Sequence, residues 1–120
     1  MANVFKSAML DVTTTGLTTL ITVPTADPGA SPPVPPTTAV IKSILVCNDS
    51  ANTTLLDIEV VRSSATFEVF KEKSLATKTT TELLEQPLVL QESDVMKVQA
   101  NAANQVHITA SYMEITKGQL

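Results

Sequence analysis

The residues that could do chemistry in this chain are few and lie far apart in the sequence. Cys47 is the only cysteine and His107 is the only histidine. A thiol and an imidazole can act as nucleophile and general base when they lie within hydrogen-bond reach of each other. Cys47 ends an apolar run and His107 lies in a different predicted strand, so we interpret Cys47 as a small buried hydrophobe and His107 as a surface residue. We therefore predict no catalytic residue and no enzymatic activity.

A second group with chemical potential is the acidic turn at residues 91–94, Gln-Glu-Ser-Asp, which precedes a predicted strand. Glu92 and Asp94 offer two carboxylates, but calcium takes about six to eight oxygen ligands, so a calcium site would also need Glu85 or backbone carbonyls. One cysteine allows neither an intramolecular disulfide nor a thiolate cluster. We predict no metal site and no cofactor.

Charge and hydropathy limit the classes of partner. The net charge is −4 and the eight basic residues are scattered, whereas a nucleic-acid surface needs clustered Lys and Arg. Residues 1–6 lack the charged and apolar regions of a secretion signal, and no apolar run approaches the roughly 20 residues that span a bilayer. We expect a chain made in the cytoplasm that binds neither nucleic acid nor membrane.

The elements that must position these residues are short β-strands. Thr, Val and Ile dominate the segments between turn signals, which favours strands, because β-branched side chains pack well on a pleated surface. The turn signals recur at intervals of about ten residues, a spacing typical of β-sandwiches. The sequence predicts an all-β fold, an antiparallel β-sandwich of jelly-roll or Ig-like type with about eight short strands.

The stretch from Thr38 to Ser63 organises this prediction. Two apolar runs, 39–47 and 55–62, are joined by the polar residues 48–52, and this pattern predicts a β-hairpin. The first run is apolar on both faces, as in a central strand covered on both sides. Alternation in the second run points Leu56, Ile58 and Val60 to the core and Asp57 and Glu59 to solvent.

Later segments follow the same reasoning. Residues 66–70 predict a strand, Lys71-Glu72-Lys73 a charged turn, and residues 75–84 an edge strand that Lys78 protects from pairing with other chains. In the last two predicted strands, alternation places the following residues inward: Met96, Val98, Ala100, Val106, Ile108, Ala110 and Tyr112.

We divide the chain into an N-terminal arm (1–6), one sandwich domain (7–116) and a C-terminal tail (117–120). The domain carries a loop at 24–36 that holds six of the seven prolines. Proline lacks the amide donor, so we expect this loop to stay outside any sheet ladder; it is either a stiff contact loop or a plain connector. The candidate protein-contact residues are Val4, Phe5, Pro28, Pro32, Pro33, Val34, Pro35 and Pro36.

Over residues 13 to 116 the chain resembles a family of small virion proteins of tailed bacteriophages, particularly marine and cyanobacterial phages. The matching features are Thr15-Gly16-Leu17-Thr18-Thr19-Leu20, the run from Val40 to Asn48, Leu90-Gln91-Glu92-Ser93-Asp94, and Ala110-Ser111-Tyr112-Met113-Glu114-Ile115. The sequence departs from the family in its long proline loop, where a shorter turn is expected.

The resemblance implies a β-sandwich subunit of a phage particle that assembles in the host cytoplasm. Its partners would be other virion proteins and further copies of itself, since repeated copies gain affinity through avidity. We expect an accessory protein of the neck or tail. The alternatives are a decoration (cement) protein on the capsid head and a carbohydrate-binding β-sandwich module.

Overall fold

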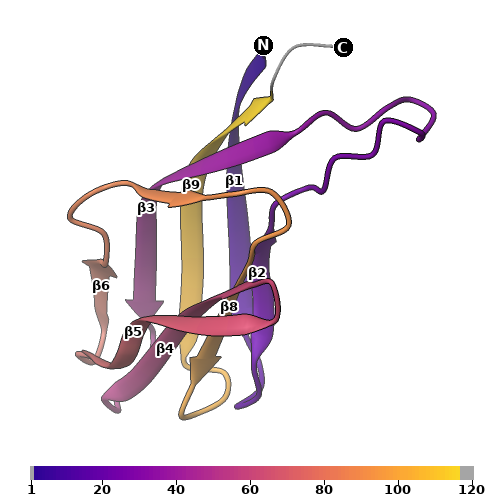
Figure 1. The fold of residues 1–120 in the computed structure, drawn as a ribbon. Helices are drawn as coiled ribbons and strands as arrows, with labels where there is room; N and C mark the ends of the chain where they lie inside the picture. The colour runs from indigo at the N-terminus through magenta and orange to yellow at the C-terminus, as the bar shows by residue number, and fades with distance from the viewer. Residues whose placement is uncertain (1, 117–120) are drawn as a thin grey trace.

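The computed structural model describes residues 2–116, and the predicted C-terminal tail at 117–120 lies outside them. The all-β prediction is confirmed, because the described residues form nine antiparallel strands in two packed sheets (Figure 1). No helix of the described part is long and apolar enough to cross a membrane. The strands are β1 (Ala2–Val12), β2 (Thr18–Thr22), β3 (Thr37–Asn48), β4 (Thr54–Arg62), β5 (Ala65–Leu75), β6 (Thr79–Glu82), β7 (Leu88–Leu90), β8 (Val95–Ala100) and β9 (Val106–Thr116).

The order of the strands identifies the sandwich as a jelly roll. Sheet A has the order β1-β9-β3-β6, and β7 pairs with β3 on the same edge as β6; sheet B has the order β2-β8-β4-β5. The pairs are therefore nested, first strand with last and second with second-last, as in a long hairpin rolled into two layers. An Ig-like sandwich, the other predicted type, is excluded because it would place the first two strands side by side in one sheet.

The core lies between the sheets and consists of aliphatic side chains. The predicted alternation in β4, β8 and β9 is confirmed, since every second residue is buried from Thr54 to Val60, from Met96 to Ala100 and from Val106 to Ala110. Tyr112 is half-buried and packs against the core. The confirmed inward residues are Leu56, Ile58, Val60, Met96, Val98, Ala100, Val106, Ile108 and Ala110.

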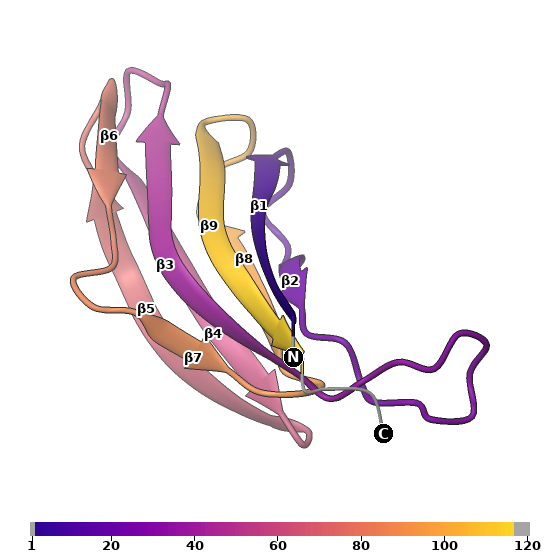
Figure 2. The ribbon, with the colours of Figure 1, turned by 90° about the horizontal axis from the view of Figure 1, so that it is seen from above.

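The predicted hairpin at 38–63 is wrong, because β3 belongs to sheet A and β4 to sheet B (Figure 2). Residues 49–53 carry the chain from one layer to the other. Asn48, fully buried, holds this crossing: its Nδ2 donates to the carbonyls of Asn52 (2.8 Å) and Leu75 (3.1 Å), and its Oδ1 accepts from the N–H (3.1 Å) and hydroxyl (2.8 Å) of Ser50. The same turn-forming residue types therefore occur both in hairpins and in segments that cross from one sheet to the other.

A hairpin with a two-residue turn joins β4 to β5. Its turn residues, Ser63 and Ser64, both have positive φ (51° and 66°), as a type I′ turn requires. Such turns favour Asn-Gly, because L side chains other than Asn and Asp are strained in this region. The Ser63-Ser64 pair is therefore under backbone strain, and its residue types do not predict this turn.

Replacing these two residues (Ser63→Asn with Ser64→Gly) is expected to raise the free energy of unfolding by about 1 kcal/mol, because the relieved strain exceeds the added chain entropy. The urea midpoint of the purified protein measures this. Ser74→Gly, at a regular exposed position of β5, is the control and should lower stability by about 0.5–1 kcal/mol. A double variant no more stable than the parent would refute the turn assignment.

Three further predictions need correction. Residues 2–6 do not form a separate arm; they continue β1 and pair with residues 112–116 of β9. Residues 71–73 are not a turn but part of β5, where two register shifts and a positive φ at Glu72 (51°) accommodate the charged residues. The face of β3 that points away from the core is not covered, since Leu45 is 40% exposed. The predicted edge strand at 75–84 is confirmed only for β6, which lies at the edge of sheet A. Leu75 ends β5, and Lys78 lies in the turn before β6.

Glu82, at the end of β6, stabilises an irregular part of β3. The register between β3 and β9 shifts between Ile41 and Ser43, and the Glu82 carboxylate accepts hydrogen bonds from the Ser43 hydroxyl and from the backbone N–H of Ile44 (2.8 Å) and Leu84 (3.2 Å). Burial opposes the charged form of Glu82, but these donors together outweigh it and lower its pKa. The ionised side chain of Glu82 therefore provides hydrogen-bond acceptors for backbone N–H groups near the bulge in β3.

Candidate interaction surface

The proline-rich loop projects from the sandwich as a narrow finger (Figures 1 and 2). It leaves the body at the end of the molecule where β1 begins, because Thr37 and Ala2 both pair with Thr116 of β9. Asp27 and Val34 form a β-bridge with two backbone hydrogen bonds (2.8 and 2.9 Å). The prediction that the loop stays outside the sheet ladders is confirmed, since no residue of 24–36 belongs to a strand of either sheet. The bridge lies within the loop, at two residues that retain an amide N–H.

The base of the finger is fastened to the acidic turn at 91–94. The Glu92 carboxylate accepts a hydrogen bond from the backbone N–H of Ala26 (2.6 Å), and the hydroxyls of Thr25 and Ser93 lie 2.6 Å apart. These contacts join segments more than sixty residues apart in the sequence. The finger is thus held at its base and at its bridge, while its tip projects.

The acidic turn is held by an ion pair between the buried Asp94 and the exposed Arg62. Asp94 is fully buried and accepts from Arg62 Nε (2.8 Å), Arg62 Nη2 (2.6 Å) and the backbone N–H of Gln91 (2.7 Å). The hydrogen bonds from Arg62 lower the pKa of Asp94 and outweigh the opposing effect of burial. The oxygens of Asp94 and Glu92 considered for calcium thus bind donors of the protein, and no group of three metal-ligating side chains occurs in residues 2–116.

The predicted contact residues divide between the strand β1 and the finger. Val4 (46% exposed) and Phe5 (77%) lie on opposite faces of sheet A near the start of β1. In the finger, the tip is exposed and the returning segment is half-buried. The exposed residues are Pro28, Pro32 and Pro33, and the half-buried ones are Val34, Pro35 and Pro36. The structure places both groups at the same end of the sandwich.

Phe5 belongs to an apolar row that the sequence did not predict. On the outer face of sheet A, Phe5 pairs with Met113, Met113 with Val40, and Val40 with Val89, so the row crosses β1, β9, β3 and β7. Phe5 and Val89 are exposed and the two central residues are half-buried. The alternation that predicts residues 107, 109 and 111 on the outer face extends to Met113. The places of Val40 and Val89 in the row can be predicted only when the order of the strands is known.

Cys47 and His107, predicted to lie in different strands, are neighbours in the structure. They are direct partners across β3 and β9, and His107 also pairs with Asp11 of β1, its Nε2 lying 3.3 Å from Oδ1. Cys47 is half-buried on the outer face rather than a core residue, whereas His107 is exposed as predicted. No hydrogen bond joins thiol and imidazole, the contact that an activated cysteine needs.

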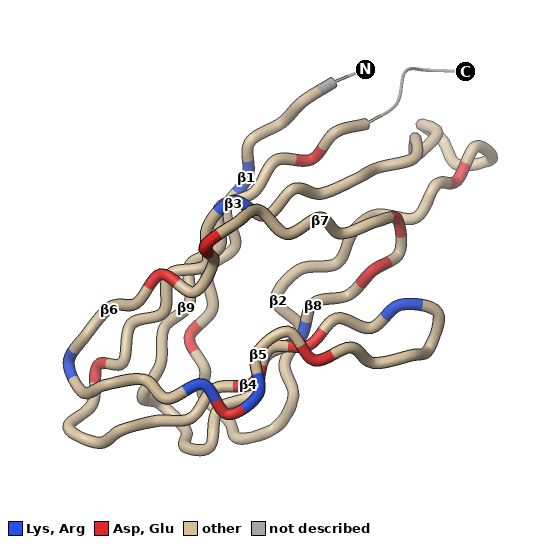
Figure 3. The backbone as a smooth tube through the Cα atoms, turned by 60° about the vertical axis from the view of Figure 1, so that its left-hand side comes forward, with Lys and Arg blue, Asp and Glu red and all other residues tan. Residues whose placement is uncertain are grey.

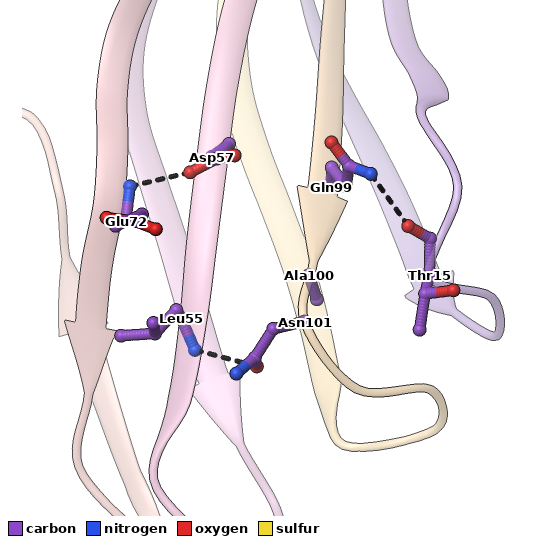
Figure 4. Close-up of a pocket in the computed structure, with 7 residues that line it drawn as sticks. All are labelled: Thr15, Leu55, Asp57, Glu72, Gln99, Ala100 and Asn101. Carbon is purple, nitrogen blue, oxygen red and sulfur yellow. Dashed lines mark hydrogen bonds between the residues drawn. The ribbon is translucent and has the colours of Figure 1, made fainter.

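A polar hollow of about 220 Å³ lies on the outer side of sheet B (Figure 4). Its hydrogen bonds connect neighbouring segments: Asp57 accepts from the N–H of Glu72 (2.6 Å), Asn101 from the N–H of Leu55 (3.0 Å), and Gln99 Nε2 donates to the carbonyl of Thr15 (2.8 Å). These side chains bind backbone groups of β4, of β5 and of the loop before β2. The hydrogen bonds that line the hollow therefore stabilise sheet B.

Basic and acidic residues are both distributed along the strands and turns (Figure 3). Lys6 bonds Glu114 (2.8 Å), and Lys71 lies 3.5 Å from both Asp57 and Glu68. The apolar row on sheet A carries no charge of its own. The surface with the strongest potential for protein contact is thus the end of sheet A where this row and the finger lie.

No protein-family model matches the chain, and no curated protein or solved structure is significantly similar to it.

Proposed function

We propose that this chain is a structural subunit of a tailed-bacteriophage particle and binds other virion proteins, as an accessory protein of the neck or tail. The observation that carries the proposal is the anchored finger. A loop that is held at its base and stiffened by prolines loses little conformational entropy when a partner binds its tip. Such a loop is suited to repeated contacts in an assembly.

Two further features support the proposal. Jelly rolls recur in viral shell proteins, although a fold alone does not define a function. The resemblance to tailed-phage virion proteins rests on segments that lie in β3 and β9, at the start of β2 and in the turn that holds the finger. The alternative is that the chain is a decoration protein on the capsid head.

The proposal is tested by the protein composition of purified particles of the phage that encodes the chain. Quantitative mass spectrometry should find the chain in many copies, and a reconstruction should find it at the neck or tail. Density on the capsid shell would favour the decoration role. Absence of the chain from purified particles would refute the proposal.

Shortening the finger tests its role directly. Residues 28–33 are replaced by Asn-Gly, which keeps the Asp27–Val34 bridge and closes it with a two-residue turn. The thermal midpoint should change by only a few degrees, while incorporation into particles should fall at least about tenfold if the tip supplies roughly 1.4 kcal/mol or more of binding free energy. Normal incorporation of the shortened protein would show that the finger is only a connector between β2 and β3.

A variant with Pro28, Pro32 and Pro33 replaced by Ser is the matched control for length. It keeps a finger of the same reach but loses the stiffness that proline gives. Incorporation between that of the parent and that of the shortened protein is expected. Parental incorporation would mean that stiffness does not matter for binding.

A further inference from the structure

The edges of the two sheets differ in how they are protected against pairing with another chain. An open edge strand can pair with a second molecule, and proteins usually prevent this with short strands, bulges or charges. β6 and β7 have only four and three residues. β5 has two register shifts and three consecutive charged residues, and the five-residue β2 has a register shift as well.

β1 is neither short nor bulged, and its charged residues Lys6 and Asp11 both lie beside partners on β9. It is eleven residues long, pairs with β9 in one continuous register, and contains neither proline nor glycine. Its one lysine, Lys6, is held by Glu114 on the inner face (2.8 Å). Within residues 2–116, no strand pairs with the other edge of β1.

The most exposed large hydrophobic side chains of the described residues also lie on this strand. Phe5 and Met9 are each 77% exposed, and both point to the outer face of sheet A. They are placed symmetrically about Ser7, which is also the midpoint of β1. An antiparallel pairing of two β1 strands centred on Ser7 would therefore match all eleven residues.

We propose that two copies of this chain pair through their β1 strands, antiparallel about a two-fold axis at Ser7, and join their A sheets into one continuous sheet. Phe5 of each copy then faces Met9 of the other on the outer face, and Val4 faces Leu10 on the inner face. Cross-strand pairs of this kind stabilise antiparallel sheets, and sulfur–aromatic contacts are favourable. Lys6 faces Ala8 and Asp11 faces Asn3, so no like charges meet.

The backbone of β1 is oriented for this pairing. The Val12 carbonyl accepts a hydrogen bond from the Asn104 N–H (2.8 Å) and therefore points to the β9 side. Alternate residues direct their backbone groups to opposite edges, so Ser7 and the other odd-numbered residues present theirs at the open edge. Two Ser7 residues on the axis would form a hydrogen-bonded pair with Cα atoms about 5.5 Å apart.

This spacing permits a cross-linking test on the purified full chain, independent of any phage particle. In a Cys47→Ser background, Ser7→Cys should form an intermolecular disulfide under mild oxidation, because about 5.5 Å lies within disulfide range. Ser111→Cys is the matched control: Ser111 is exposed beside Ser7 on β9, one strand further from the axis, so its two copies lie beyond the roughly 7 Å limit. Equal cross-linking of the two variants would refute the pairing.

The mass of the unmodified protein provides the second readout. Light scattering over a roughly 100-fold range of concentration should reveal a monomer–dimer equilibrium. Phe5→Lys should weaken the dimer by at least about tenfold, since it removes two symmetry-related pairs. Phe67→Lys, at an exposed phenylalanine of the bulged edge strand β5, should leave the dimer unchanged. A monomer at every concentration, or equal effects of both lysines, would overturn the proposal.

Discussion

Asn48→Asp is expected to lower the free energy of unfolding by about 3 kcal/mol, although the two side chains have nearly the same shape. The Asn48 amide group donates to the carbonyls of Asn52 and Leu75. A carboxylate would instead turn an acceptor toward these two acceptors in a fully buried position. Chemical denaturation at neutral pH measures the change.

Asn52→Asp is the matched control, because it makes the same chemical change four residues away at an exposed position. Its expected effect is within about 0.5 kcal/mol. The destabilisation by Asn48→Asp should decrease as the pH falls, since a protonated carboxyl can donate one of the lost hydrogen bonds. Equal effects of the two substitutions would mean that Asn48 does not hold the crossing between the sheets.

Asp94→Asn is expected to destabilise the protein by about 2–3 kcal/mol. Both carboxylate oxygens of Asp94 accept hydrogen bonds, from Arg62 and from the N–H of Gln91. An amide NH₂ in either place would face a donor, and the charge that pairs with Arg62 would be lost. Asp49→Asn, on an exposed side chain, is the control and should change stability little.

The pH dependence of this pair has a definite sign. The pKa of Asp94 is lowered in the folded protein, mainly by the hydrogen bonds from Arg62. Its contribution to stability is therefore complete above the unfolded pKa of about 4 and is lost as the pH falls through the folded pKa. Asp94→Asn should approach the parent in stability at low pH. A constant difference across the acid range would contradict the role of the charge.

Local patterns in the sequence were enough to predict the class of the fold and much of its core. The alternation of Leu56, Ile58 and Val60 identified a half-buried strand, because period 2 is a property of the strand itself. The hairpin prediction failed at Asn48, since its decisive partner, the Leu75 carbonyl, lies 27 residues away. No local pattern distinguishes a turn within a sheet from a crossing between sheets.

The candidate surface was predictable only in part. Phe5 and the proline loop stood out by composition, but the row with Met113 and Val89 depends on which strands are neighbours. The contacts of Cys47 and His107 depend on the same fact. Strand order is set by the packing of the whole chain, and a single sequence without relatives carries little direct information about it.

The nested pairing of the strands also bears on biosynthesis. β1 is the first of these strands to leave the ribosome, yet its partner β9 is the last. Sheet A therefore cannot form completely during translation. The eleven residues of β1 remain without their partner strand until β9 has emerged. Nascent chains stalled before β9 should be easily digested by proteases, and crowded polysomes of this protein would be a natural setting for strand exchange between copies.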